Sequence, residues 1–265
     1  MKILPPRTFP PNARIERRHQ PDGVTGRYGY RAYRACLRWE FGFTCAFCLL
    51  HEADLAPFGA EGLGLMTIEH FVPVSAAGEK AAEYRNCYYA CRLCNQSRSN
   101  APVVDGRERR LLDPCQHIWS EHFRVDSDGR FLPVEGDPDA AYTARLYDLN
   151  DERRLALREF RRQRLTEALR MLREGPEEIQ MLLEECSVAP PERSVVLLRA
   201  AARLRTLILL ARLDLQRFAA IPRDADNDCR CGHRAHHSLP AGLNEQTLDV
   251  RTFPPDLKWW GLLAE

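Results

Sequence analysis

The chain has 265 residues, a formal net charge of +1 at pH 7 and 45% hydrophobic residues. This length suits one large domain or two of ordinary size, and the hydrophobic content is sufficient for a buried core. So small a net charge excludes a strong overall field that would draw the protein to nucleic acids or membranes. The charge is uneven, however, because residues 1–40 hold nine Lys and Arg against three Asp and Glu.

The chain lacks the usual marks of export and of membrane insertion. Its first residues, MKILPPRTFPPNARIERR, place prolines where a secretory signal needs an apolar run. The apolar stretch 195–215 is interrupted by four arginines, which a bilayer core does not tolerate. In such a chain, ten cysteines favour thiols and metal ligands over disulfides. We therefore expect a cytoplasmic protein without a membrane partner.

The first half of the chain predicts a basic arm and a compact mixed region. Residues 1–27 are rich in Pro and Arg and predict an extended arm, and residues 29–41 predict a helix with one apolar side. Most of the Cys and His residues follow, between residues 42 and 100. Short strands are expected near Phe123 and Phe131, separated by a turn at residues 126–129.

The second half predicts helices. Helical spacing of apolar residues covers 153–174, 176–186 and 191–220, and Gly175-Pro176 is expected to end the first of these helices. The leucines of the last helix suit the core of a helical bundle better than a groove for a partner. The expected domains are an arm at 1–27, a Cys- and His-rich domain at 28–135, a helical domain at 136–221 and a tail at 222–265.

Two C-x-x-C pairs are the strongest local signal. Each pair points two thiolates at one metal ion, and Zn²⁺ prefers four soft ligands in a tetrahedron. Four buried cysteines without metal are the alternative, but two matched pairs seldom occur by chance. The ligands of the predicted structural zinc are Cys45, Cys48, Cys91 and Cys94.

Between the pairs lies the segment TIEHFVP, residues 67–73. Its β-forming residues predict a strand that stops at Pro73. Glu69 offers a hard metal ligand, and His70 offers a general base that titrates near neutral pH. Neighbours on a strand face opposite sides, so both reach one site only near a strand end or a bulge. By itself the dipeptide is also compatible with a surface Glu and a half-buried His.

The combined pattern resembles the HNH endonucleases, the ββα-metal family, in the variant whose last position is Asn. Asn86 follows His70 by sixteen residues, and Asn95 follows Cys94 directly, where a helix is expected to begin. The resemblance covers roughly residues 28–125. It rests on Cys45, Cys48, Glu69, His70, Pro73, Asn86, Cys91, Cys94 and Asn95.

The resemblance implies an α+β fold with a ββα-metal core and a role for each matching residue. His70 would deprotonate the attacking water, while Glu69 and Asn95 would hold one catalytic Mg²⁺ or Mn²⁺. Asn86 would brace the loop between the strands and aim the His70 ring. The zinc would be structural. The chain departs from the family in having Glu rather than Asp at 69 and Arg98 where Lys is frequent.

Several further residues are candidates for binding. Phosphate contacts are expected from Arg14, Arg17, Arg18, Arg92 and Arg98. We expect a packed thiol at Cys87. A packed loop, rather than a metal cluster, is expected at Cys115, His117 and His122. The tail offers a second zinc site or a segment with adventitious metal affinity; the ligands of that second site are Cys229, Cys231, His233 and His237.

The sequence therefore predicts a metal-dependent endonuclease that hydrolyses DNA phosphodiester bonds, with DNA as its partner. Family habit suggests a bacterial defence protein or a mobile-DNA enzyme. Two alternatives stay open: a zinc module that binds nucleic acid without cleaving it, and a nuclease acting on RNA. A protein partner bound through the C-terminal helices is also left open.

Overall fold

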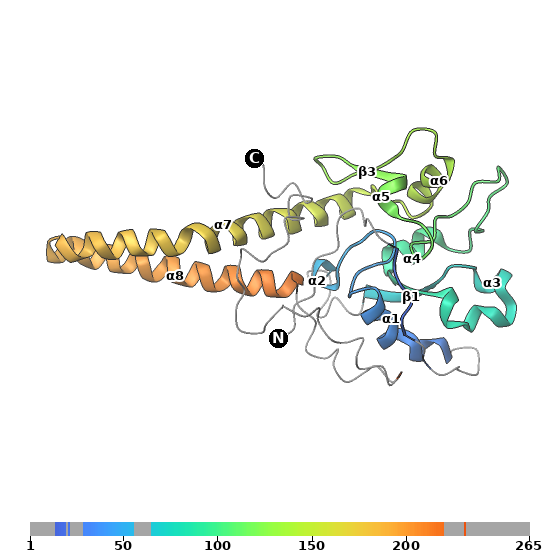
Figure 1. Cartoon of the computed structure of the whole chain (residues 1–265), viewed down its shortest axis with the longest axis horizontal. Helices are drawn as coiled ribbons and strands as arrows, with labels where there is room; N and C mark the ends of the chain where they lie inside the picture. Colours follow the sequence, from blue (N-terminus) through green and yellow to red (C-terminus); the bar gives the residue numbers. More distant parts are fainter. Residues whose placement is uncertain (1–13, 20, 22–28, 56–64, 220–230, 232–265) are drawn as a thin grey trace. The chain divides into compact units, whose positions relative to one another are not determined.

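The computed structural model describes residues 14–19, 21, 29–55, 65–219 and 231 (Figure 1). These residues divide into two compact units. The first unit contains the described residues up to Glu159 together with Cys231, and the second contains residues 160–219. Two small antiparallel sheets occur among helices, which confirms the α+β class. Within the described ranges, no helix combines the length and apolar character that a membrane span requires.

The first unit begins with short helical segments that supply much of its core. The helical stretch predicted for residues 29–41 is confirmed as η1 (Gly29–Tyr33) followed by α1 (Arg34–Glu40). A third segment, α2 (Glu52–Leu55), follows the first cysteine pair. A buried ion pair links α1 to α2, because Arg38 donates two hydrogen bonds of 2.9 Å to the carboxylate of Glu52.

The larger feature of this unit is a strand pair followed by a helix. Strand β1 (Met66–His70) pairs antiparallel with β2 (Cys87–Cys91), with His70 opposite Cys87 and Met66 opposite Cys91. Helix α4 (Arg92–Arg98) starts directly after β2. All five residues of β2 are buried, so this strand lies inside the unit. The connection between the strands holds α3 (Val74–Ala77), η4 (Gly78–Ala82) and η5 (Tyr84–Asn86).

The predicted second strand pair is also confirmed. Strand β3 (Phe123–Val125) pairs with β4 (Phe131–Pro133) across the expected turn, where Gly129 has a φ of +76° that favours glycine. The rings of Phe123 and Phe131 pack edge to face beside Trp119 of α5 (Trp119–His122). Helix α6 (Pro138–Leu146) follows, and the Asp137 carboxylate caps its first turn. This helix belongs to the first unit, beyond the boundary predicted at residue 135.

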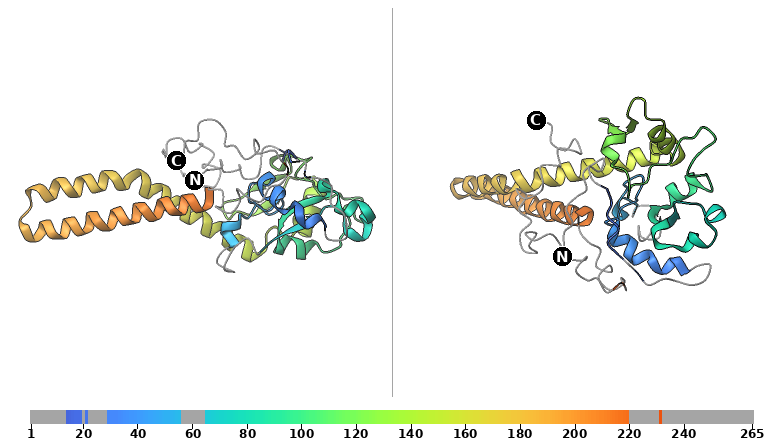
Figure 2. Two further views of the ribbon diagram at one scale, coloured as in Figure 1. Left: turned by 90° about the horizontal axis from the view of Figure 1, so that it is seen from below. Right: turned by 45° about the vertical axis from the view of Figure 1, so that its right-hand side comes forward.

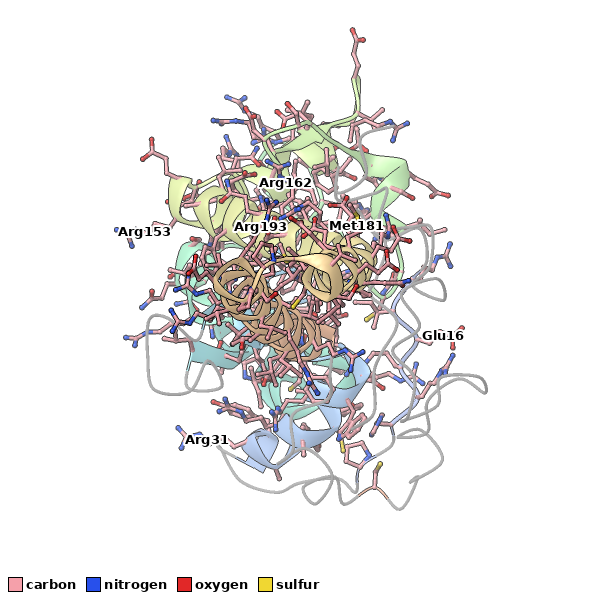
Figure 3. The ribbon with its side chains drawn as sticks, turned by 90° about the vertical axis from the view of Figure 1, so that its left-hand side faces the viewer. Glu16, Arg31, Arg153, Arg162, Met181 and Arg193 are labelled. Atoms are coloured by element: carbon pink, nitrogen blue, oxygen red, sulfur yellow. The ribbon has the colours of Figure 1, made fainter. Side chains whose placement is uncertain are left out.

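The second unit is a helical hairpin. Helix α7 (Glu152–Val188) begins in the first unit and continues into the second, where α8 (Pro191–Ala219) runs antiparallel beside it (Figures 1 and 2). Both charged and apolar side chains are exposed on the two helices, among them Arg193 and Met181 (Figure 3). Arg193 of α8 bonds Glu185 of α7 next to the connection. Several leucines of α8 that were expected in a bundle core, including Leu198 and Leu213, are exposed. The helix predicted for residues 191–220 is confirmed up to Ala219, the last described residue of α8.

The break predicted at Gly175-Pro176 is wrong, because α7 continues through Pro176 without interruption. Proline removes one backbone hydrogen bond and crowds the preceding turn, but packing can outweigh that local cost. Here the hairpin supplies the packing. A Cβ atom on Gly175 would lie 2.8 Å from Cδ1 of Ile208, so the missing side chain lets α7 approach α8 closely.

Candidate metal centre and active site

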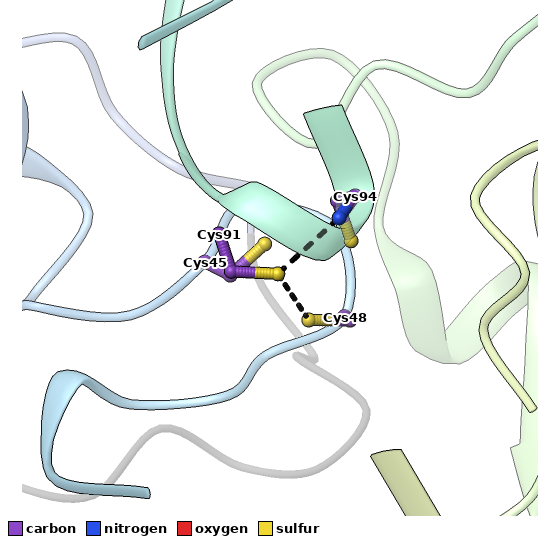
Figure 4. Close-up of side chains that lie close together, drawn as sticks. All are labelled: Cys45, Cys48, Cys91 and Cys94. Atoms are coloured by element: carbon purple, nitrogen blue, oxygen red, sulfur yellow. Dashed lines mark hydrogen bonds between the residues drawn. The ribbon is translucent and has the colours of Figure 1, made fainter. Parts of the chain in front are cut away.

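The four predicted zinc ligands lie together in the first unit. Cys45 and Cys48 lie in the loop after α1, Cys91 ends β2, and Cys94 lies in the first turn of α4 (Figure 4). All four side chains are buried, and their sulfur atoms lie within 4.8 Å of one another. Two segments far apart in the sequence therefore converge on one point, as the paired C-x-x-C spacing predicts.

The geometry fits a tetrahedral zinc ion. Sulfurs bound to one Zn²⁺ at ~2.3 Å lie about 3.8 Å apart, and the Sγ atoms of Cys48 and Cys91 are separated by 3.5 Å. The backbone N–H of Cys94 points at the Cys91 sulfur over 3.4 Å, so this sulfur caps α4. The first pair is fixed to β2 as well, because the N–H of Ala46 donates to the carbonyl of Tyr89. The site is thus able to hold zinc.

Two arginines at the start of α7 supply positive charge to this site. A zinc ion with four thiolates carries a formal charge of about −2. The Arg154 guanidinium lies 3.8 Å from the Cys94 sulfur, and Arg158 donates a 3.2 Å hydrogen bond to the carbonyl of Cys48. Both arginine side chains are buried. Sequence reasoning missed them, although their spacing of four residues places them on one face of the helix.

The environment of the cluster shifts the pKa values of individual thiols in different directions. Burial raises the pKa of Cys94, and its contacts with the other three thiols act in the same direction. Burial also opposes ionisation of Cys48, yet hydrogen bonds from the other thiols and the nearby charge of Arg154 hold its pKa well below the usual range. The cluster therefore favours a thiolate at Cys48, the species that binds a soft metal ion.

Glu69 is a buried carboxylate on β1. Its residue is 3% exposed, and its Oε1 atom lies 3.2 Å from Nη1 of Arg98 in α4. Arg98 also donates a hydrogen bond to the carbonyl of Phe71, just beyond the strand. Burial raises the pKa of Glu69 to about 8, although the Arg98 guanidinium acts in the opposite direction. This carboxylate is therefore hard to ionise without additional positive charge.

His70 ends β1 with a different set of contacts. Its ring packs edge to face on Tyr30, with ring centroids 4.6 Å apart, and Nδ1 lies 3.9 Å from the Cys87 sulfur. The Nε2 atom is buried and has no hydrogen-bond partner among the described residues. Burial lowers the pKa of His70, the Ala81 carbonyl opposes this shift, and the charge of Arg98 reinforces it. The imidazole is thus neutral at physiological pH.

The two asparagines are both engaged with β1 or the loop beyond it. The Asn86 amide exchanges two hydrogen bonds with the backbone of Val72, accepting one of 2.7 Å and donating one of 3.0 Å. Asn95 in α4 donates from Nδ2 to the Thr67 hydroxyl over 3.0 Å and to the Ile68 carbonyl over 3.3 Å. Asn86 therefore bridges the connection between the strands, and Asn95 ties α4 to β1.

Of the predicted catalytic residues, Glu69 and Asn95 lie where α4 packs on β1, whereas the His70 ring makes other contacts. Thr67 and Glu69 share one face of β1, and α4 reaches this face through Asn95 and Arg98. His70 is the neighbour of Glu69 at the strand end, and its ring contacts Tyr30 and Cys87 rather than α4. Sequence reasoning missed the bond between Glu69 and Arg98, because the pair is distant in the chain and meets only when α4 packs on the strand.

The predicted phosphate contacts fall into two groups. Arg17 and Arg98 are largely buried, and they bond the carboxylates of Glu40 and Glu69, respectively. Because they are buried and paired with carboxylates, these two arginines contribute to the packing of the first unit. Arg14, Arg18 and Arg92 are exposed, although Arg18 bonds the surface carboxylate of Glu16 over 2.8 Å.

The remaining Cys and His candidates also have defined surroundings. Cys87 is buried, and burial raises the pKa of its thiol to about 12, as expected for a packed, unreactive thiol. His122 bonds Asp137 over 2.6 Å, and its ring lies beside that of His117. Of the tail candidates, Cys229, His233 and His237 lie outside the described residues. The fourth, Cys231, lies beside His19.

In a comparison with known proteins, no protein-family model, curated protein or solved structure matches the chain.

Proposed function

We propose that this protein is a metal-dependent nuclease of the HNH type. The observation that carries the proposal is a pair of neighbouring buried polar groups at the end of β1. Glu69 is a nearly inaccessible carboxylate with a raised pKa, and His70 keeps a buried ring nitrogen without a hydrogen-bond partner among the described residues. Buried polar groups without a hydrogen-bond partner are rare in proteins. Buried groups with strongly shifted pKa values are concentrated at catalytic sites.

The surroundings of this pair support the same chemistry. Glu69 offers carboxylate oxygens, and Asn95 donates through its amide nitrogen to β1, which leaves its amide oxygen as the other polar atom. Hard oxygen donors of this kind suit Mg²⁺ or Mn²⁺, and these two residues would hold the ion. A bound divalent ion neutralises the charge that develops on the phosphate during hydrolysis.

The protein's own residues would perform the remaining tasks. His70, neutral at physiological pH, accepts the proton of the attacking water. Asn86 holds the loop after His70 through its two bonds to Val72, and so restricts the position of the strand end. Arg98 orients the Glu69 carboxylate while the metal is absent. Arg14, Arg18 and Arg92 would contact the nucleic-acid backbone, and such contacts suit DNA and RNA alike. The proposed substrate is DNA, with RNA as the alternative.

The pH dependence of cleavage is expected to follow Glu69 rather than His70. Metal binding needs an ionised carboxylate, and the pKa of Glu69 is about 8 without metal, so cleavage rises as the pH increases toward 8. His70 has a lowered pKa and has already lost its proton below this range. Because metal and proton compete for the carboxylate, raising the Mg²⁺ concentration shifts the midpoint of the rise to lower pH. A midpoint that is independent of Mg²⁺ would assign this rise to another group.

The decisive experiment is a cleavage assay with supercoiled plasmid DNA, run with Mg²⁺, with Mn²⁺ and with EDTA, and repeated on single-stranded RNA. Nicking that requires the added ion is expected for the wild-type chain. Asn95→Ala is expected to lower the rate by about 10- to 100-fold, since one of two protein metal ligands is lost. Gln96→Ala, an exposed neighbour in the same helix, is the matched control and retains the wild-type rate.

Absence of cleavage of either nucleic acid by folded, zinc-containing protein would overturn the nuclease proposal. Retained binding of DNA under those conditions would then favour a zinc module that binds without cleaving. Cleavage restricted to RNA would keep the chemistry and change the substrate.

A further inference from the structure

A second group of metal-binding side chains lies outside the four-cysteine site. His19, Cys36 and Cys231 each bring one ligand atom to the same place, and these atoms lie within 4.8 Å of one another. The Sγ atom of Cys231 is 3.2 Å from Nδ1 of His19. The three residues come from the N-terminal segment, from α1 and from the C-terminal region, so the fold rather than local sequence brings them together.

Two of these side chains are held firmly by the first unit. His19 is 4% exposed, and its backbone N–H donates a 2.8 Å hydrogen bond to Oε1 of Glu40. The other oxygen of Glu40 accepts hydrogen bonds from Arg17 over 2.6 Å and from the Tyr84 hydroxyl over 2.8 Å. One buried carboxylate therefore anchors the segment before His19 to the end of α1.

Cys36 lies within α1 itself and is 2% exposed. An imidazole nitrogen and a thiol are thus held inside the first unit, beside the partly exposed Cys231. Preorganised ligands of this kind strengthen metal binding, because less conformational freedom is lost when the ion enters.

The chemistry of the three donors selects a soft or borderline ion. One nitrogen and two sulfurs match the Cys₂His type of zinc site, and nitrogen and sulfur bound to one tetrahedral Zn²⁺ lie about 3.6 Å apart. The 3.2 Å separation between His19 and Cys231 is close to this value. Cys231 is partly exposed, so the group is accessible to an ion from solution.

We propose that His19, Cys36 and Cys231 form a second zinc site, independent of the four-cysteine site and of any nuclease activity. The proposal replaces the ligand set predicted within the tail alone, with only Cys231 shared between the two sets. Three protein ligands leave one position of the tetrahedron for water or for another side chain.

The second ion would fasten the C-terminal region to the first unit. Cys36 and Cys231 are 231 − 36 = 195 positions apart in the sequence, and the chain between them includes the whole helical hairpin. A metal bond across so long a loop restricts the unfolded chain strongly. Zinc would therefore protect the residues around Cys231 from proteolysis, while a chain that lacks this site exposes them.

The test is a count of bound zinc in the full-length protein, measured by mass spectrometry of the metal after extensive dialysis. The wild-type chain is expected to carry two ions per molecule. Cys231→Ser, Cys36→Ser and His19→Ala are each expected to carry one, and His19→Cys is expected to restore the second because it replaces one soft donor by another. Cys186→Ser is the matched control, since Cys186 is also partly exposed and lies in α7, outside both groups.

Cobalt substitution provides a readout that separates lost binding from failed folding. Cys231→Ser is expected to lose the absorption of one Co²⁺ ion and to keep the four-thiolate spectrum of the other. The proposal is overturned if the wild-type chain binds one ion only. A second result would also overturn the proposal. In that result, His19→Ala and Cys36→Ser each keep two zinc ions, whereas Cys229→Ser or His237→Ala keeps only one. The tail would then bind the second ion by itself.

Discussion

Removal of zinc from the four-cysteine site is expected to unfold the first unit of the full-length protein. Structural zinc contributes about 10 kcal/mol or more to the folding of small metal modules. Without the ion, four buried cysteines and the two buried arginines beside them lose the charge balance that the metal provides. The cooperative thermal transition of this unit, followed by circular dichroism, should disappear after a strong zinc chelator is added and return with excess Zn²⁺.

A single substitution should reproduce much of this effect. Cys94→Ser removes one ligand and the sulfur that lies 3.8 Å from Arg154, so Arg154 is left buried beside an incomplete metal site. Cys186→Ser alters a cysteine outside the site and should keep the wild-type melting temperature. Equal melting temperatures for the chelated and the zinc-containing protein would show that packing alone holds the two cysteine pairs together.

Replacement of His70 by alanine is expected to lower the cleavage rate by about 10²- to 10⁴-fold, the range typical of a lost general base. The fold should be retained with a modest loss of stability, because Nε2 of His70 makes no hydrogen bond to any described residue and the ring loses its contacts with Tyr30, Cys87 and the Ala81 carbonyl. The measurement is the initial rate of plasmid nicking at saturating Mg²⁺ near pH 8. His122→Ala is the control, since His122 is also partly buried but bonds Asp137 in another part of the unit.

Added imidazole distinguishes a lost base from a disturbed site. Substitution of the ring by a methyl group leaves space beside Tyr30 and Cys87, and free imidazole can enter it and accept the proton. Partial recovery of the His70→Ala rate, with no effect on His122→Ala, is the expected result. A His70→Ala protein that nicks DNA at the wild-type rate would remove His70 from the mechanism.

The sequence was most informative where the chemistry is local. A C-x-x-C pair constrains its own backbone, so Cys45, Cys48, Cys91 and Cys94 could be assigned to one metal site before any fold was known. The short strands near Phe123 and Phe131 were similarly predicted on either side of a turn at residues 126–129. In both cases a few neighbouring residues contain the whole physical signal.

Features that depend on packing between distant segments could not be predicted. Arg154 lies 60 residues from Cys94 along the chain, and nothing in the helical pattern marks it as a neighbour of sulfur. The break expected at Pro176 failed for the same reason, because the closeness of α8 at Gly175 is a tertiary property. The pairing of Glu69 with Arg98 and the meeting of Cys231 with His19 likewise arise only in the folded unit.

The wide separation of the two cysteine pairs has a consequence during synthesis on the ribosome. Between Cys48 and Cys91 lie 91 − 48 = 43 residue steps, which take about 2 to 9 s at ~5–20 residues per second. Throughout that interval the first pair has emerged without its partner ligands. Arg154 follows Cys94 after a further 60 residues, or about 3 to 12 s later. During this period the thiols of the nascent chain can be oxidised or can bind the wrong metal ion. The growing polypeptide therefore depends on a reducing environment with buffered metal concentrations until α7 begins to emerge.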